Sequence, residues 1–290
     1  MFNARSALFL AAVCVAGFAA PAVAADPVTT SREYKVMLNP SAFSGNAATA
    51  VANFWNALKA LIENASIHRP TTGNLNTVST RTVRFYDTPG TCVLDRSDYS
   101  FRERVQNGNR EVTLKFRSPD RFIADKRDVE GDDNAAVTKF EEDISAPFRS
   151  VYSHSSTVPI GAGKNLNYMD DPIGLFPGLG PLGFNESEPI AIVGGLSVYE
   201  KAYEGASVDL GALLAQFSLT LWYASSSATT PLLAEISFKY GHPTADYSNN
   251  VVTRAKALFE AMQAMTPWVA PNALLKTSFV YQYDPNFCQP

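Results

Sequence analysis

The chain has 290 residues and is mildly acidic, with 24 Lys and Arg against 28 Asp and Glu. This balance excludes the generally basic surface of proteins that bind nucleic acids or membrane surfaces, so any anion site must be a local group of cations. Hydrophobic residues make up 46% of the sequence, which is ample for the core of one large domain.

Residues 1–25 have the pattern of a secretory signal peptide. Arg5 gives the positive start, residues 7–20 the apolar segment, and residues 22–25 a cleavage site of small residues. The apolar segment is shorter than a membrane span requires. We therefore predict a secreted or periplasmic protein that is not inserted in a membrane, with residues 26–290 forming a single domain.

The first elements predicted after this segment are a strand at residues 31–38, an amphipathic helix at 47–64 and a strand at 77–86. In the first strand, Glu33 and Lys35 alternate with other residues and therefore share one face. In the helix, apolar residues recur at helical spacing, which indicates that one side packs against a sheet.

The strongest local pattern is a β-hairpin centred on Asn107-Gly108. Alternating polar and apolar residues flank this pair, which is typical of a two-residue hairpin turn. In that register, the residue numbers of two opposite residues add up to 215, so that Arg104 lies opposite Glu111 and Arg102 opposite Thr113. Because side chains alternate along a strand, the charged side chains share one face. The cations on that face are Arg102, Arg104, Lys115 and Arg117, answered by Glu111 and Asp98.

Two interpretations of this charged face are open. Polar residues on an antiparallel sheet usually form a solvated outer surface. An excess of cations on one concave surface is, however, typical of a site that holds phosphate or another polyanion.

Three motifs in this region resemble those of the CYTH family, the triphosphate tunnel metalloenzymes. Residues 85–89 (FYDTP), 100–104 (SFRER) and 113–115 (TLK) are similar in order and spacing to that family's YFDTP, sLRiR and tLK motifs. The resemblance is clearest from Glu33 to Lys115. It implies an α+β fold in which about eight strands form a closed or nearly closed antiparallel tunnel with helices packed outside. It also implies a charged interior that binds triphosphate or polyphosphate, commonly with Mg²⁺ or Mn²⁺.

The carboxylates that the resemblance assigns to a metal are fewer than the family pattern has. The ExExK motif of the first strand has Ser31 in place of its first glutamate, and the late EiE motif has Ser237 in place of its second. The resemblance implies Glu33, Glu141 and Glu235 as metal ligands and Glu33, Lys35 and Glu235 as catalytic residues. For Glu33, an ion pair with an arginine is an equal alternative.

The resemblance and the strand pattern together give the predicted anion-binding residues. These are Arg102, Arg104, Lys115, Arg127 and Lys201. Arg127 falls in a strand predicted at 121–130, paired with another at 137–144, and Lys201 falls in a strand predicted at 196–205.

The remaining predicted elements complete the tunnel. They are strands at 217–223, 232–240 and 276–283 and a helix at 247–265. Residues 159–189 are dense in Gly and Pro and cannot form a central strand or long helix, so we expect an insertion there, a candidate lid over one tunnel mouth.

Cys92 and Cys288 are the two cysteines that remain after the predicted cleavage. In an oxidising compartment such an isolated pair favours a disulfide, and two free buried thiols are the alternative. We predict a bridge that fixes the C-terminal tail beside the loop at 89–95.

The sequence shows no zinc-hydrolase motif, no GxSxG elbow and no strand-linked GxGxxG motif, so a tunnel would be the place for any active site. The hypothesis is an exported tunnel protein that binds a phosphorylated small molecule or polyphosphate, with metal-dependent triphosphate hydrolysis left open. The alternatives are a ligand-binding protein without catalysis and a structural protein with an internal ion-pair network.

Overall fold

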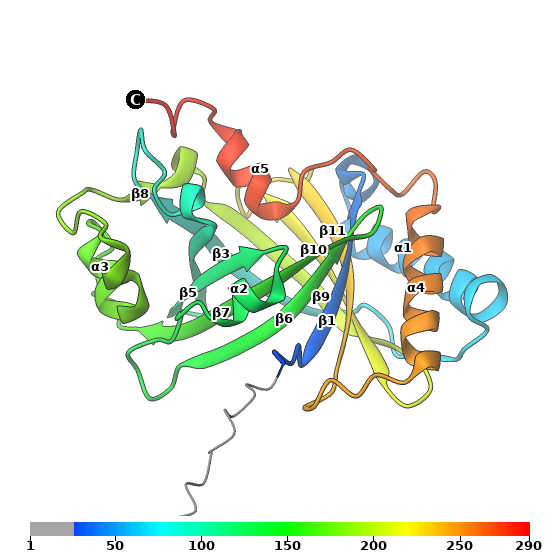
Figure 1. The fold of residues 1–290 in the computed structure, drawn as a ribbon. Coiled ribbons are helices and arrows are strands. Elements are labelled where there is room, and N and C mark those ends of the chain that lie inside the picture. The colour runs from blue at the N-terminus through cyan, green and yellow to red at the C-terminus, as the bar shows by residue number, and fades with distance from the viewer. Residues whose placement is uncertain (1–25) are drawn as a thin grey trace, which may run out of the picture.

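The computed structural model describes residues 26–290, and the predicted signal peptide lies outside the described residues. Nine strands form a closed barrel in the order β9-β10-β11-β1-β6-β7-β5-β4-β3, which the pairing of β3 with β9 completes (Figure 1). The barrel strands are β1 Ser31–Leu38, β3 Thr77–Asp87, β4 Tyr99–Gln106, β5 Asn109–Ser118, β6 Val137–Ser145, β7 Arg149–Ile160, β9 Val198–Asp209, β10 Leu214–Tyr223 and β11 Leu233–Gly241.

The predicted α+β tunnel is therefore confirmed, with a mixed rather than fully antiparallel sheet. Neighbouring strands cannot all alternate in direction around a closed ring of nine, so at least one pair must be parallel. That pair is β1 and β6, and all other pairings are antiparallel. Two short strands outside the barrel, β2 Thr71–Thr72 and β8 Ala191–Ile192, pair with β9 and β3.

The hairpin of β4 and β5 has the predicted register. Arg104 is opposite Glu111, and Arg102 is opposite Thr113. Asn107 and Gly108 have φ angles of 52° and 82°, the left-handed conformation that a two-residue turn of this kind requires at both positions. The turn thus determines which side chains of β4 and β5 face the tunnel.

Two predicted strands are helical in the structure. Residues 121–130 contain α2 (Arg121–Asp125) followed by a loop, because the Asp120 carboxylate accepts hydrogen bonds from the first backbone N–H groups and caps a helix. β6 pairs instead with β7, which the sequence pattern missed. Residues 276–283 form α5 (Lys276–Tyr283), and the barrel is closed by β3 and β9 instead.

The main hydrophobic core lies outside the barrel, between its wall and two helices. These are α1 (Ala47–Leu61), extended by a π-helical turn at Ile62–Ser66, and α4 (Asn249–Gln263) (Figure 1). Leu58 of α1 and Leu258 of α4 are fully buried in the same cluster as Tyr34 and Ile236 of the wall. Outward-facing side chains of β1, β9, β10 and β11 thus form the core, and their inward-facing neighbours are left for the tunnel.

The Gly/Pro-rich segment covers the outer wall of β4 and β5 rather than a tunnel mouth. It contains α3 (Asp170–Leu175), and its Phe176 and Leu179 are buried in the same cluster as Phe101 and Leu114 of the hairpin. The lid that we considered for this segment is therefore not its role in the structure. Its apolar residues cover the apolar face of the hairpin, so the charged face is the inner one.

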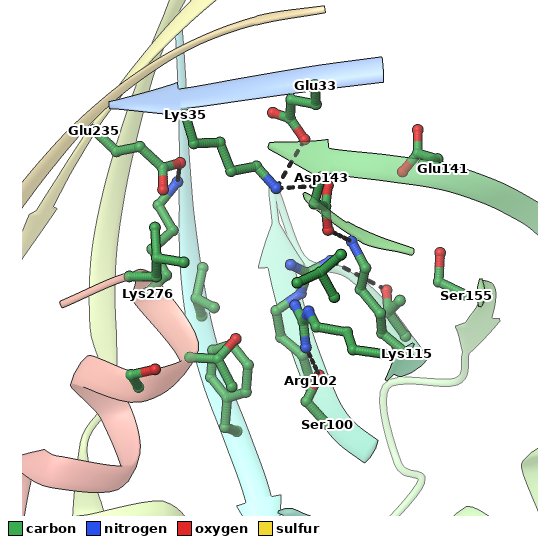
Figure 2. A pocket seen from close by; sticks show the side chains of 18 of the residues that line it. Glu33, Lys35, Ser100, Arg102, Lys115, Glu141, Asp143, Ser155, Glu235 and Lys276 are labelled. Carbon is green, nitrogen blue, oxygen red and sulfur yellow. Dashed lines mark hydrogen bonds and ion pairs between the residues drawn. The ribbon is translucent and has the colours of Figure 1, made fainter. Parts of the chain in front are cut away.

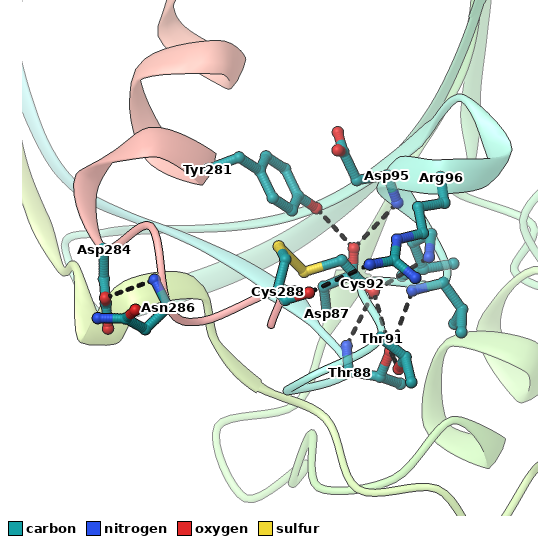
Figure 3. Close-up of a disulfide and its surroundings, with 12 residues drawn as sticks. Asp87, Thr88, Thr91, Cys92, Asp95, Arg96, Tyr281, Asp284, Asn286 and Cys288 are labelled. Atoms are coloured by element: carbon teal, nitrogen blue, oxygen red, sulfur yellow. Dashed lines mark hydrogen bonds between the residues drawn. A yellow bond between two sulfur atoms is a disulfide. The ribbon is translucent and has the colours of Figure 1, made fainter. Parts of the chain in front are cut away.

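The C-terminal helix α5 packs at one end of the barrel and is fixed there by a disulfide. Val280 of α5 is buried with Phe85 and Trp222, which face inward at that end. The predicted bridge between Cys92 and Cys288 is present (Figure 3). Among residues 26–290, no helix is both long and apolar enough to span a membrane.

Candidate functional site

A cavity of about 460 Å³ lies inside the barrel, and residues from all nine barrel strands line it. Its lining is mainly polar, whereas a small barrel without a ligand is normally filled by apolar side chains. A second cavity of about 610 Å³ shares Arg104, Lys139 and Thr157 with the first and extends to the hairpin turn at Asn107. The tunnel is thus covered by α5 at one end and continues toward the hairpin turn at the other.

Charges in the described lining are balanced in number but not in position. The cations are Lys35, Arg102, Arg104, Lys115, Arg117, Lys139 and Lys276, and the carboxylates are Glu33, Asp95, Asp98, Glu141, Asp143, Glu200 and Glu235. Five of these carboxylates are held in ion pairs, whereas the guanidinium groups of Arg102 and Arg117 form none in the described structure; the five are Glu33, Glu141, Asp143, Glu200 and Glu235.

Lys35 and Lys115 neutralise two carboxylates on the wall formed by β1 and β6. The Lys35 ammonium lies 3.1 Å from a Glu33 oxygen and 2.8 Å from an Asp143 oxygen, and Lys115 Nζ lies 2.9 Å from the other Asp143 oxygen (Figure 2). Burial would raise the pKa of Asp143, but Lys115 and Lys35 hold that pKa well below its usual range.

A second group of ion pairs surrounds Glu200, which is almost completely buried. Its carboxylate accepts a hydrogen bond of 2.6 Å from Trp222 Nε1 and pairs with Arg81. Lys276 of α5 lies 2.8 Å from Glu235 Oε1 and 3.9 Å from Glu200 Oε2. Burial would raise the pKa of Glu200, but Lys276 and neighbouring arginines hold it well below its usual range.

Glu141 is held separately from these two groups. It accepts a hydrogen bond of 2.8 Å from Ser31 Oγ and forms an ion pair with Lys239. Figure 2 shows Glu141 apart from the Glu33–Lys35–Asp143 group.

The hairpin wall carries arginines that these pairs leave unneutralised. Within the described chain, Arg102 makes one long hydrogen bond, of 3.4 Å, to Thr113 Oγ1, and Arg117 donates to Ser100 Oγ at 3.1 Å. Arg104 approaches Glu111 only to 3.9 Å. The Nε atoms of Arg102 and Arg104 are buried without a hydrogen-bond partner in the described structure.

Burial and the repulsion between neighbouring cations lower the pKa values of side chains on this wall. Burial, and then repulsion from Arg104, lowers the pKa of Arg102 well below its ordinary value. Because guanidinium groups do not lose their proton in proteins, this shift expresses the cost of an unneutralised cation. Burial also lowers the pKa of Lys115 to about 8, although Asp143 opposes the change.

The carboxylates present do not fit a divalent metal. Mg²⁺, Mn²⁺ and related ions require several oxygen ligands that converge on one point. Among the described residues no three His, Cys, Asp or Glu side chains form such a group. Of the three implied ligands, Glu33 is bound by Lys35, Glu235 by Lys276 and Glu141 by Lys239.

Most of the predicted site residues line the cavity. They are Glu33, Lys35, Arg102, Arg104, Lys115, Glu141 and Glu235. Arg127 does not, because it follows α2 outside the barrel and lies over the ring of Phe116. Lys201 does not either, because it shares the outer face of β9 with Tyr203 and lies over the Tyr223 ring.

Glu200 and Arg81, to which the sequence analysis gave no role, complete the site together with Asp143, Arg117, Trp222 and Lys276. A signal for Glu200 was present, because Lys201 shares a strand face with two tyrosines that belong to the outer core and its neighbour must then face inward. Lys276, for which a last cation of the tunnel and a surface lysine were both open, does line the cavity, but it comes from the helix α5 and not from the strand predicted at 276–283.

No protein-family model matches the sequence, and no curated protein matches it either. Among solved structures, the candidate adenylyl cyclase HpAC1 from Hippeastrum, described as having a dominant triphosphatase activity, is 13% identical over 88% of this chain and 96% of its own, with a TM-score of 0.44. A candidate adenylate cyclase from Bacillus halodurans is 8% identical over 88% and 99%, with a TM-score of 0.39.

A third similar structure is a candidate adenylate cyclase from Vibrio parahaemolyticus. It is 10% identical over 88% of this chain and 99% of its own, with a TM-score of 0.35.

Proposed function

We propose that the protein binds a phosphorylated small molecule or short polyphosphate in its tunnel, and that it does so through the hairpin wall. The observation that carries the proposal is Arg102, an inward-facing guanidinium with a buried Nε that has no partner in the described structure. Guanidinium groups bind phosphate oxygens through paired, charge-assisted hydrogen bonds, which is the chemistry that this group lacks in the ligand-free protein.

The neighbouring residues support an extended anion rather than a single phosphate. Arg104 and Arg117 lie on either side of Arg102 along the same face of the hairpin, and Lys115 faces the same space. Alternate residues of a strand are separated by roughly 6.6 Å, so these cations can contact successive groups of a linear anion.

The test is calorimetric titration of the purified mature protein with inorganic triphosphate. We expect Arg102→Ala to weaken binding roughly tenfold to a hundredfold, since a hydrogen bond to a charged group contributes about 1.5–3 kcal/mol. Lys256→Ala is the matched control, because Lys256 lies on the exposed side of α4 in a pair with Glu260. Unchanged affinity in Arg102→Ala contradicts the proposal.

The ion-pair groups favour a second candidate, a structural role without a ligand. The cavity-lining carboxylates of β1, β6, β9 and β11 each have a cationic partner, which is how buried charges are tolerated in a folded protein; they are Glu33, Asp143, Glu141, Glu200 and Glu235. This candidate predicts no binding of triphosphate by the wild-type protein, so the same titration separates the two.

Metal-dependent hydrolysis, which the resemblance implies through Glu33, Lys35 and Glu235, is not part of this proposal, because Lys35 and Lys276 already hold the two glutamates in ion pairs. The direct assay is phosphate release from triphosphate with and without Mg²⁺ or Mn²⁺, beside Glu33→Ala. Turnover that requires metal and is lost in Glu33→Ala supports an enzyme, whereas binding without turnover supports a binding protein.

We also propose that the protein acts after export. The pattern of residues 1–25 and the Cys92–Cys288 bridge support this, because disulfides form in oxidising compartments. Cell fractionation with and without residues 1–25 tests it, and retention of the full chain in the cytoplasm contradicts it.

A further inference from the structure

We propose that two lysines, Lys35 and Lys276, take the place of a divalent cation in this tunnel, so that the site binds the metal-free form of its anion. This inference rests on the proposed function for the identity of the ligand. The exclusion of a divalent cation by the two lysines does not depend on which anion binds, and it has its own test.

Lys35 lies where a metal held by the inner carboxylates would have to be. Its ammonium is 2.8 Å from Asp143 and 3.1 Å from Glu33 (Figure 2). Glu235 is close enough to stabilise the same charge, and these three carboxylates together outweigh burial in raising the pKa of Lys35. Glu33 and Asp143, with Glu235 nearby, are therefore placed around an ammonium group and do not converge on a separate metal position.

A metal and this ammonium group cannot share the position. Mg²⁺ and Ca²⁺ bind oxygen ligands at about 2.0–2.6 Å and need at least six of them. Binding at Glu33 and Asp143 would bring a divalent cation into contact with Lys35 Nζ, where like charges in a partly buried site repel strongly. The metal could bind only if Lys35 left both carboxylates.

Lys276 neutralises two further carboxylates, Glu235 and Glu200, and it belongs to α5, outside the barrel strands. It lies between Glu235 and Glu200, at 2.8 Å and 3.9 Å, and its position depends on α5. The bridge from Cys288 to Cys92 and a hydrogen bond of 2.9 Å from Tyr281 OH to Asp87 hold the C-terminal segment (Figure 3). The second ammonium group is thus fixed by covalent and polar contacts.

These pairings determine the form of the ligand. With Glu33, Asp143, Glu235 and Glu200 already neutralised, the positive charge left for a ligand comes mainly from Arg102, Arg104 and Arg117 of the hairpin wall, together with Lys139 of β6. A Mg²⁺ complex of triphosphate has a lower negative charge than the free anion and would bring a second cation toward these arginines. The free anion should therefore bind more tightly.

The first experiment measures metal binding alone, by the loss of the free Mn²⁺ electron paramagnetic resonance signal. We expect no binding to the wild-type protein at 1 mM Mn²⁺, and binding to the double variant Lys35→Ala/Lys276→Ala, in which the carboxylates are freed. Lys256→Ala is the control and should behave as the wild type. If circular dichroism shows that the double variant is unfolded, Lys276→Ala replaces it.

Two outcomes of this experiment overturn the inference. One is binding of Mn²⁺ by the wild-type protein at or below 1 mM. The other is a folded variant that lacks the lysines and still binds no Mn²⁺, which would show that the ammonium groups do not occupy a potential metal position.

The second experiment is titration with triphosphate in EDTA and in excess Mg²⁺. We expect binding in EDTA and an affinity at least threefold lower in Mg²⁺. Binding that requires Mg²⁺ contradicts the inference but leaves the proposed function intact. Absence of binding in both buffers contradicts the proposed function, and the Mn²⁺ experiment then decides the metal statement by itself.

Discussion

Lys276 Nζ lies 2.8 Å from Glu235 Oε1, so a residue of the C-terminal helix forms an ion pair with the inner wall of the barrel at β11. The helix α5 packs at one end of the barrel, where Val280 is buried. The strand β11 has its outward-facing side chains in the hydrophobic core outside the barrel, and Glu235 on its inner face. The tunnel is therefore built jointly by the barrel and by a segment that is fixed to it by a disulfide.

Removal of the disulfide should lower both stability and anion affinity. The bridge joins residues 196 positions apart, a loop for which chain-entropy arguments give about 5 kcal/mol as an upper value. We expect Cys92→Ser/Cys288→Ser to lose roughly 2–5 kcal/mol in urea unfolding and to bind triphosphate less tightly, because Lys276 is less firmly placed. Dithiothreitol should reproduce these effects in the wild type and add nothing in the variant. A stable variant with unchanged affinity contradicts this role of the tail.

The affinity for triphosphate should depend on the ionisation of Lys115. Its pKa is lowered to about 8 by burial, so the lysine is protonated and attracts an anion below that pH and loses its charge above it. We expect the wild-type affinity to fall between pH 7 and 9.5 relative to that of Lys115→Arg, which stays charged. The ratio of the two affinities is the measured quantity, because ionisation of triphosphate affects both proteins equally. A ratio that does not change with pH shows that Lys115 does not contact the ligand.

The ionisation of Lys115 should also make the unfolding free energy of the ligand-free protein depend on pH. Because its folded pKa of about 8 lies below the ordinary value of 10.5, the unfolded chain binds more protons between these pH values. Lys115 therefore destabilises the ligand-free fold at neutral pH, and its contribution to stability rises between about pH 8 and 10.5. Lys115→Met should be more stable than the wild type at pH 7 if Asp143 remains paired with Lys35.

Substitution of Glu200 should change stability and binding in opposite directions. Glu200→Gln removes the carboxylate that holds Arg81 and accepts from Trp222, so we expect a loss of about 3 kcal/mol of unfolding free energy. The same change removes a negative charge close to Arg104 and Lys276, so triphosphate should bind several-fold more tightly. Glu204→Gln, at an exposed position of the same strand, is the control for both measurements. Weaker binding in Glu200→Gln is the contradictory outcome.

The outer wall has a buried charge whose role is structural. Glu103, on the outer face of β4, is fully buried and accepts hydrogen bonds from Arg84 at 2.9 Å, Arg110 at 2.7 Å and Tyr86 at 3.1 Å. Glu103→Ala leaves these donors without an acceptor, and we expect a loss of roughly 3–5 kcal/mol in chemical unfolding. Glu260→Gln, in an exposed pair on α4, should cost under about 1 kcal/mol. Equal effects of the two substitutions contradict this assignment.

The residues that the sequence predicted correctly are those whose position depends on local geometry. The Asn107-Gly108 turn sets the register of β4 and β5, so the inward direction of Arg102, Arg104 and Lys115 could be derived from strand alternation alone. The errors at Arg127 and Lys201 have local causes as well. Asp120 caps a helix before Arg127, and Lys201 shares its strand face with tyrosines of the outer core.

The sequence by itself thus determined the charged hairpin face, the cation types on it and the tunnel architecture that its motifs imply. Only the tertiary structure decided which charges neutralise one another, because β1 meets β6 and β11, and α5 reaches Glu235, across large sequence separations. Side-chain alternation gives the face of each strand, but the partner of a charge depends on strand order and on where the chain end is fixed. For that reason the pairing of Lys35 with Glu33 and Asp143, and the unneutralised Arg102 opposite them, could be seen only in the folded barrel.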